Sequence, residues 1–98
     1  MDFKVIWSDE AIADLRDICS YLAQHDPEAA LRTGTGILDH VRIPAGFPFI
    51  GPPYPSGARG PLREIVYRSY RIFYDVSEEL RAVDILHVWH GAREDPNF

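Results

Sequence analysis

Hydrophobic and polar positions follow two different periods along this chain, and the change of period separates a helical half from a strand-forming half. The opening segment FKVIWS (3–8) is short and rich in β-branched and aromatic residues, which is typical of a strand. Residues 9–24 predict an amphipathic helix, because apolar side chains recur there at helical spacing. These apolar positions are Ile12, Leu15, Ile18, Cys19 and Leu22.

Capping residues mark the starts of two helices. Ser8 stands at an N-cap position before two acidic residues, whose charges favour the positive end of the helix dipole. Asp26 caps a second helix whose first turn begins with Pro27 and Glu28. The apolar face predicted for this second helix consists of Ala30, Leu31, Ile37, Leu38 and Val41.

Glycine and proline punctuate the middle of the chain. Gly34 and Gly36 lie inside the second helix, where each costs roughly 0.5–1 kcal/mol relative to alanine. We interpret both as places where two antiparallel helices pack closely. The following segment, IPAGFPFIGPPYPSGARGP (43–61), is more than half proline and glycine, so we expect no regular helix or strand within it.

The remaining chain alternates as strands do. Segments 62–67 and 70–76 flank Arg68 and Ser69, which predicts a tight hairpin. The third strand, AVDILHVWH (82–90), is expected to place Val83, Ile85, His87 and Trp89 on one face of the sheet. The predicted fold is α+β, in the order β-α-α-β-β-β, with an antiparallel sheet packed on a helical hairpin in a single domain, 1–98.

The charge of the chain is unevenly distributed. The formal net charge is −5, which argues against general coating of nucleic acid. Arginines nevertheless gather beside tyrosines in and around the predicted hairpin, at Arg59, Arg63, Arg68 and Arg71. Because arginine and tyrosine are enriched at protein interfaces, we interpret this hairpin as a local docking surface.

Several classes of site and location are not expected. Cys19 is the only cysteine, so no intrachain disulfide can form. His87 and His90 are three residues apart on one strand and therefore point to opposite faces, which argues against a metal site. We expect no cofactor and no metal. No leader and no long apolar run is visible, so we expect a cytoplasmic protein without a membrane association.

The element order, the segment YRIFYDV and the closing segment HVWHGARED together resemble the RelE/ParE superfamily, over nearly the whole chain. These proteins are toxins of type II toxin–antitoxin systems, often described as plasmid-stabilisation proteins. The resemblance implies growth inhibition, a cognate antitoxin that neutralises the toxin, and a heterotetramer with that antitoxin as an expected assembly. RelE-like members cut messenger RNA on the ribosome, whereas ParE-like members are associated with DNA gyrase.

The match favours the ParE-like branch. Arg71 falls where RelE-like enzymes carry a phosphate-binding arginine, and Arg93 falls near the other arginine of that site. The catalytic lysines of that branch are expected near Glu64 and Val66, and neither residue can replace them. RelE-like enzymes carry a tyrosine on a helix after the last strand. We expect no such helix here, because the sequence ends at Phe98.

The resemblance therefore implies inhibition of an essential target, with DNA gyrase as the family-level expectation. One alternative is a messenger-RNA endoribonuclease using the catalytic candidates Arg71, Arg93 and His90. A second alternative is a non-toxic binding protein that keeps the fold. The candidate residues for binding a target or antitoxin are Arg63, Arg68, Tyr70, Arg71 and Arg93.

Structural roles compete with these functional ones. Arg71 can stack on Tyr70 or Phe73, or pair with Asp75. His87 can be a core-facing histidine with a hydrogen-bond partner. We interpret the acidic residues of the first helix as a solvated stripe, formed by Asp9, Glu10, Asp14 and Asp17.

Overall fold

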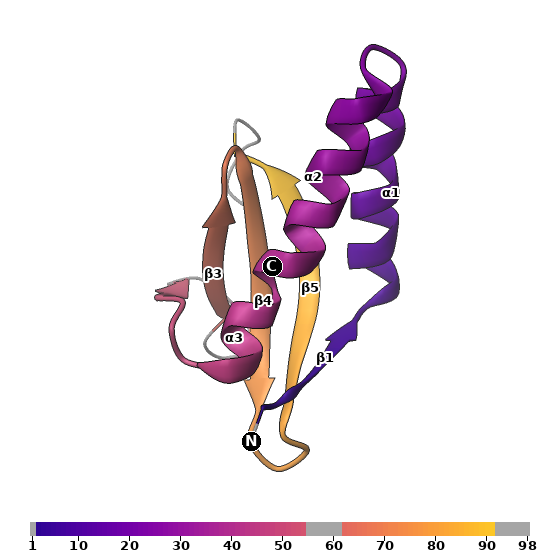
Figure 1. Ribbon diagram of the computed structural model, residues 1–98. Coiled ribbons are helices and arrows are strands. Elements are labelled where there is room, and N and C mark those ends of the chain that lie inside the picture. Colours follow the sequence, from indigo (N-terminus) through magenta and orange to yellow (C-terminus); the bar gives the residue numbers. More distant parts are fainter. Residues whose placement is uncertain (1, 55–61, 92–98) are drawn as a thin grey trace.

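The structure is a computed structural model that describes residues 2–54 and 62–91 (Figure 1). Its elements are, in chain order, β1 (Lys4–Trp7), α1 (Asp9–Ala23), α2 (Pro27–His40), α3 (Arg42–Gly46), β2 (Pro53–Tyr54), β3 (Leu62–Tyr67), β4 (Tyr70–Ser77) and β5 (Ala82–His90). The described strands form one sheet in the order β1-β5-β4-β3-β2, and α1 and α2 pack as a hairpin on one of its faces. The predicted α+β fold is confirmed.

The sheet is mostly antiparallel. β3, β4 and β5 form the predicted meander, and β2 extends it antiparallel to β3. β1 instead lies parallel to β5, pairing Lys4 with Ala82 and Trp7 with Ile85. The first and the last strand of the described chain therefore lie side by side, with β1 at the edge of the sheet and β5 inside it.

Both helices begin where the sequence predicts. The Ser8 side chain accepts a hydrogen bond from the Ala11 amide at 3.0 Å, and Asp26 accepts one from Ala29 at 3.1 Å. These bonds satisfy amides of the first turn that have no partner inside the helix. None of the helices in the described ranges combines the length and the apolar character that a membrane crossing requires.

The expectation that 43–61 holds no helix or strand is wrong in two places. The short helix α3 runs through Pro44, which lies in its first turn, where the missing amide of proline costs no hydrogen bond. Within the described residues Pro53 belongs to β2, which pairs with β3 at the edge of the sheet, and an edge strand tolerates proline for the same reason. Residues 55–61, with Arg59, lie outside the described residues.

The main core fills the space between the helical hairpin and the sheet. Its buried members are Ala11, Ile37, Val41, Ile72, Tyr74, Val83, Ile85 and Val88. A register shift in the β4–β5 pairing aligns Phe73 with His87 but Tyr74 with Ile85, so Leu86 is an extra residue on β5. This bulge reverses the alternation beyond it.

The predicted division of β5 into two faces is therefore wrong after Ile85. Val88 joins the core below the helices, whereas His87 and Trp89 lie on the other face beside Phe73. The interpretation of His87 as core-facing is also wrong for this reason. Its ring contacts Trp89, with 5.4 Å between the ring centroids.

The two helix glycines have different neighbours. A Cβ at Gly34 would lie 3.1 Å from the Cys19 sulfur of α1, which agrees with close packing of the two helices. A Cβ at Gly36 would lie 1.9 Å from the Tyr67 hydroxyl oxygen, so this glycine makes room for β3 instead. The helix–helix interpretation is correct for Gly34 and wrong for Gly36.

Candidate functional site

Arg71, the first catalytic and binding candidate, is held by its neighbours on the sheet. Its Nε lies 2.5 Å from Glu64 Oε2, and only 15% of the Arg71 side chain and 20% of the Glu64 side chain are exposed. The guanidinium also lies 5.1 Å from the centre of the Phe73 ring. Stacking on Phe73 is one of the structural roles predicted for Arg71, whereas the ion pair with Glu64 was not anticipated. The carboxylate therefore neutralises the guanidinium that a phosphate would need.

Arg63 anchors the segment that leads into β2. Its Nη1 donates to the carbonyl of Gly51 at 2.7 Å and to that of Phe49 at 3.3 Å, and its guanidinium lies over the Phe49 ring. The buried Tyr74 hydroxyl donates to the Pro48 carbonyl and accepts from the Gly51 amide, both at 2.9 Å. We call residues 48–51 the anchored loop, because these bonds tie it to the sheet.

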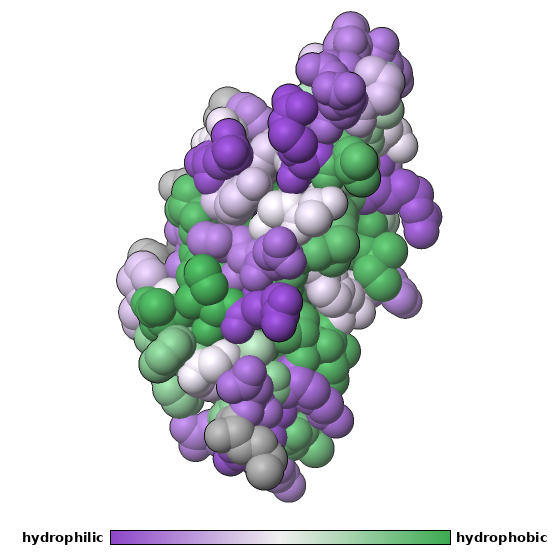
Figure 2. All heavy atoms as spheres, viewed as in Figure 1, coloured by the Kyte–Doolittle hydropathy of each residue, from purple (hydrophilic) through white to green (hydrophobic). Residues whose placement is uncertain are grey.

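Apolar side chains next to these bonds remain exposed. Phe47 is 69% exposed, and Phe49 and Ile50 are each more than half exposed. Figure 2 shows hydrophobic residues gathered on this side of the molecule, around α3 and the segment that follows it. Arg63 thus lies beside a surface suited to binding, although its own hydrogen bonds go to the loop.

Arg68 occupies the turn between β3 and β4. Its φ of 53° is in the left-handed region, which tightens the two-residue connection. The side chain is exposed, its Nε donates to the Tyr67 hydroxyl at 3.2 Å, and its guanidinium lies 5.7 Å from the Tyr67 ring centre. Of the binding candidates within the described residues, Arg68 presents its charge most openly at a tip of the sheet.

Tyr70 and His90 come together on the face of the sheet that carries the helices. The two residues are register partners, and their rings meet edge to face with 5.5 Å between the centroids. Arg71 pairs with Trp89 and therefore lies on the opposite face. Arg71 and His90 thus cannot approach the same phosphate in this arrangement. Arg93 lies outside the described residues.

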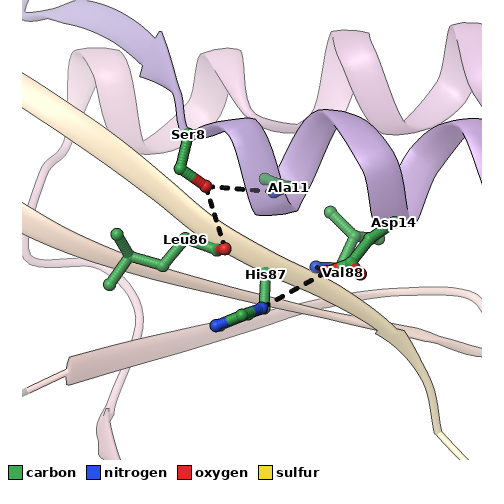
Figure 3. Close-up of polar contacts among 6 residues, drawn as sticks. All are labelled: Ser8, Ala11, Asp14, Leu86, His87 and Val88. Carbon is green, nitrogen blue, oxygen red and sulfur yellow. Dashed lines mark hydrogen bonds and ion pairs between the residues drawn. The ribbon is translucent and has the colours of Figure 1, made fainter.

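Asp14 links α1 to β5, a role that the sequence analysis missed. Its Oδ2 accepts a hydrogen bond from the Val88 amide at 3.0 Å and lies 3.4 Å from His87 Nδ1 (Figure 3). Next to it, Ser8 Oγ donates to the Leu86 carbonyl. The pairing of β1 with β5 ends at Ile85. Beyond that point the side chains of Ser8 and Asp14 make the hydrogen bonds to β5 that a longer β1 would make. The interpretation of Asp14 as part of a solvated stripe is wrong.

A groove opens where α1 passes the ends of β4 and β5. It has a volume of about 490 Å³, and we call it the α1–β5 groove. Its lining joins acidic residues of α1 to the Tyr70–His90 pair, and it includes Asp14, Asp17, Ile18, Tyr21, Tyr70 and His90. The i, i+3 and i+4 spacing of Asp14, Asp17, Ile18 and Tyr21 is the sequence signal that could have revealed this surface.

Burial changes the acidity of two tyrosines. It raises the pKa of Tyr70, and the nearby Cys19 raises it further. Burial also raises the pKa of Tyr74, although the hydrogen bond from Gly51 and the charge of Arg63 act in the opposite direction. Both phenols are therefore neutral at physiological pH. They can donate or accept hydrogen bonds, but they supply no negative charge.

The described arrangement thus combines a neutralised arginine, an anchored apolar loop, an exposed turn arginine and an acidic groove. In-line cleavage of RNA requires a proton-transfer group and cations at one phosphate. The described candidates for those roles are split between the two faces of the sheet. Binding of a partner requires only exposed, preorganised surfaces, which this chain has.

Comparison with known proteins places these features in a family. The family model described as "ParE toxin of type II toxin-antitoxin system, parDE" matches residues 5–95. No curated protein sequence matches the chain.

Solved structures share the fold at low sequence identity. A chain of the chromosomal ParDE system from P. aeruginosa has a TM-score of 0.75 and 22% identity, with 90% of this chain and 95% of that chain covered. A chain of the archaeal RelE–RelB complex from Pyrococcus horikoshii OT3 has a TM-score of 0.67 and 16% identity, with 96% and 100% covered. A chain of the RelBE2 complex from Mycobacterium tuberculosis has a TM-score of 0.57 and 20% identity, with 92% and 99% covered.

Proposed function

Because the chain belongs to the ParE toxin family of type II toxin–antitoxin systems, we propose that it acts by binding, inhibits DNA gyrase, and is neutralised by a cognate antitoxin. The observation that carries the choice of binding over catalysis is the ion pair between Arg71 and Glu64. If the chain were a RelE-like enzyme, a catalytic lysine would be expected near position 64. In this chain Glu64 stands at that position, and its carboxylate forms an ion pair with Arg71.

The exposed end of the hairpin is the surface that we assign to the target. Arg68 projects there from a left-handed turn, and its charge is available to an acidic patch on another protein. Arg81 offers a matched control at the other end of the sheet. It is also exposed, has a φ of 49°, and lies over an aromatic ring, that of Phe3.

The test is a supercoiling assay with purified gyrase and purified toxin. The wild-type protein should inhibit supercoiling, Arg68→Glu should weaken inhibition by about tenfold or more, and Arg81→Glu should leave it within about twofold. Transcripts from cells expressing the toxin should stay intact. Growth arrest without any effect on gyrase would refute the target, and A-site cleavage lost in Arg71→Ala would establish the endoribonuclease alternative.

We assign antitoxin binding to the outer side of the helical hairpin. A groove of about 520 Å³ runs there between α1 and α2, and its lining is mostly apolar. Leu31 is 72% exposed and Leu38 is 49% exposed at this surface, which suits an amphipathic helix of a partner. The P. aeruginosa structure is described as a ParDE system and the P. horikoshii structure as a complex with RelB, which supports a partner of this kind.

Co-expression with the adjacent antitoxin gene tests this surface. Leu31→Glu should remain toxic while losing rescue by the antitoxin, because a charge would be buried against apolar groups. Leu80→Glu is the control, since Leu80 is 63% exposed in the turn before β5. Light scattering of the purified complex should give the mass of a heterotetramer. Equal rescue of both variants would place the antitoxin elsewhere.

A non-toxic binding protein is the second candidate function. The net charge of −5 favours it, because an acidic chain gains little from electrostatic attraction to targets that carry phosphate. Normal growth with verified soluble protein, together with retained antitoxin binding, would establish it.

A further inference from the structure

The α1–β5 groove differs in chemistry from the apolar surfaces assigned above. Acidic and aromatic side chains face each other across it, with Asp17 and Tyr21 on α1 and with Tyr70 and His90 on the sheet. Ile18 adds an apolar wall between them. No lysine or arginine of the described residues lines the groove. Its charge and shape therefore suit a cationic side chain that has apolar neighbours.

Polar groups in the groove have capacity for further hydrogen bonds. Asp17 is exposed and makes no hydrogen bond or ion pair within the described part of the chain. The same holds for the hydroxyl of Tyr70, which is only half-buried. A carboxylate and a phenol oxygen are acceptors, and the aromatic faces of Tyr21 and Tyr70 attract cations.

The groove also lies along the part of β5 that β1 does not reach. The pairing of β1 with β5 ends at Ile85, while β5 continues to His90. At Val88 the Asp14 carboxylate takes the place of a neighbouring strand by accepting the amide. An extended segment that entered the groove would lie beside Asp14 and the end of β5.

We propose that the α1–β5 groove binds an extended segment of a partner protein in which an arginine or lysine is flanked by apolar residues. The cationic group lies between Asp17 and Tyr70, and the flanking side chains pack on Ile18 and Tyr21. The proposal does not depend on the identity of the toxin's target. It rests on charge complementarity, on the apolar wall and on the position of the groove beside β5.

The first experiment uses short synthetic peptides as the probe. One peptide carries a central arginine between leucines, a second replaces the arginine with glutamate, and a third replaces the leucines with serines. Titration of the isotope-labelled full chain is followed by NMR. The arginine–leucine peptide should shift the amide signals of Asp17, Tyr21, Tyr70 and His90 and should bind at least tenfold more tightly than either altered peptide.

Two matched variants connect binding to the groove. Asp17→Asn should weaken binding of the arginine–leucine peptide by about tenfold, because a charge-assisted hydrogen bond becomes a neutral one. Asp39→Asn, at an exposed aspartate near the end of α2, should leave binding unchanged. Equal binding of the three peptides, signal changes outside the groove, or equal affinities of the two variants would each overturn the proposal.

Discussion

Two glycines on the same helix allow the packing of α2 to be tested with a matched pair of substitutions. Gly34→Ala and Gly36→Ala make the same chemical change two residues apart. Each should gain up to about 1 kcal/mol of helix propensity, because alanine restricts the unfolded chain more than glycine does. This gain is common to both variants and cancels in their difference. What remains is the space available to the new Cβ atom.

That space differs greatly between the two positions. At Gly34 the nearest atom is the Cys19 sulfur at 3.1 Å, so the thiol has to give by only a few tenths of an ångström. At Gly36 the new Cβ would overlap the end of the Tyr67 ring, with the hydroxyl oxygen at 1.9 Å and Cζ at 2.3 Å. Tyr67 also receives a hydrogen bond from Arg68 and lies beside His40, so its ring cannot turn away without losing contacts.

Overpacking of this kind typically costs about 1–3 kcal/mol. We therefore expect Gly36→Ala to be about 1–3 kcal/mol less stable than Gly34→Ala, measured as the free energy of unfolding in urea at 25 °C. In a Tyr67→Ala background, the difference should shrink to within about 0.5 kcal/mol, because the clashing ring is gone. Equal stabilities of the two glycine variants in the wild-type background would refute this account of Gly36.

Three further predictions follow from contacts in the sheet. Asp14→Ala should lower the free energy of unfolding, measured by urea titration, by about 1–3 kcal/mol, because the Val88 amide of β5 loses its acceptor. In the same titration the control Asp17→Ala should change it by less than about 0.5 kcal/mol. Tyr74→Phe should speed hydrogen exchange in the anchored loop. Burial raises the pKa of Tyr74 in the folded protein above its unfolded value of about 10. The neutral phenol therefore makes its full contribution to the free energy of unfolding below about pH 10. This contribution is lost as the pH rises through the raised folded-state pKa of Tyr74. In that pH range the free energy of unfolding should therefore fall more steeply for the wild type than for Tyr74→Phe. Alanine substitutions of Arg71 and Glu64, alone and together, should give a coupling energy of about 1–3 kcal/mol in a double-mutant cycle, and a coupling near zero would contradict the ion pair.

Local sequence signals predicted most of the fold. Ser8 and Asp26 predict where α1 and α2 begin, because an N-cap side chain bonds to an amide only two or three residues further along the chain. The alternation of β3 and β4 likewise depends on nearest neighbours. The bulge at Leu86 escaped prediction because it arises from pairing between strands, and no residue type in β5 marks it.

The candidate site was less accessible to sequence reasoning. The sequence correctly predicts that Arg71 contacts the neighbouring Phe73 ring, but its ion pair with Glu64 depends on the register of two strands. The spacing of acidic residues along α1 predicts a solvated Asp14, because the contact with Val88 spans 74 positions in the sequence and leaves no local signal. Side-chain spacing along α1 indicates which residues share a face, but it does not show which strand lies beneath them.

The parallel pairing of β1 with β5 has a consequence for synthesis on the ribosome. Among the described elements β1 is made before the others, yet its partner residues 82–85 are made after all of them except the rest of β5. Contacts of such long sequence separation form late in folding, since a large loop has to close before they can be made. A nascent chain therefore keeps an incomplete sheet until translation has passed β5. Truncated products that end before residue 82 keep β1 but lack β5, the strand that lies between β1 and β4, so they cannot complete the sheet.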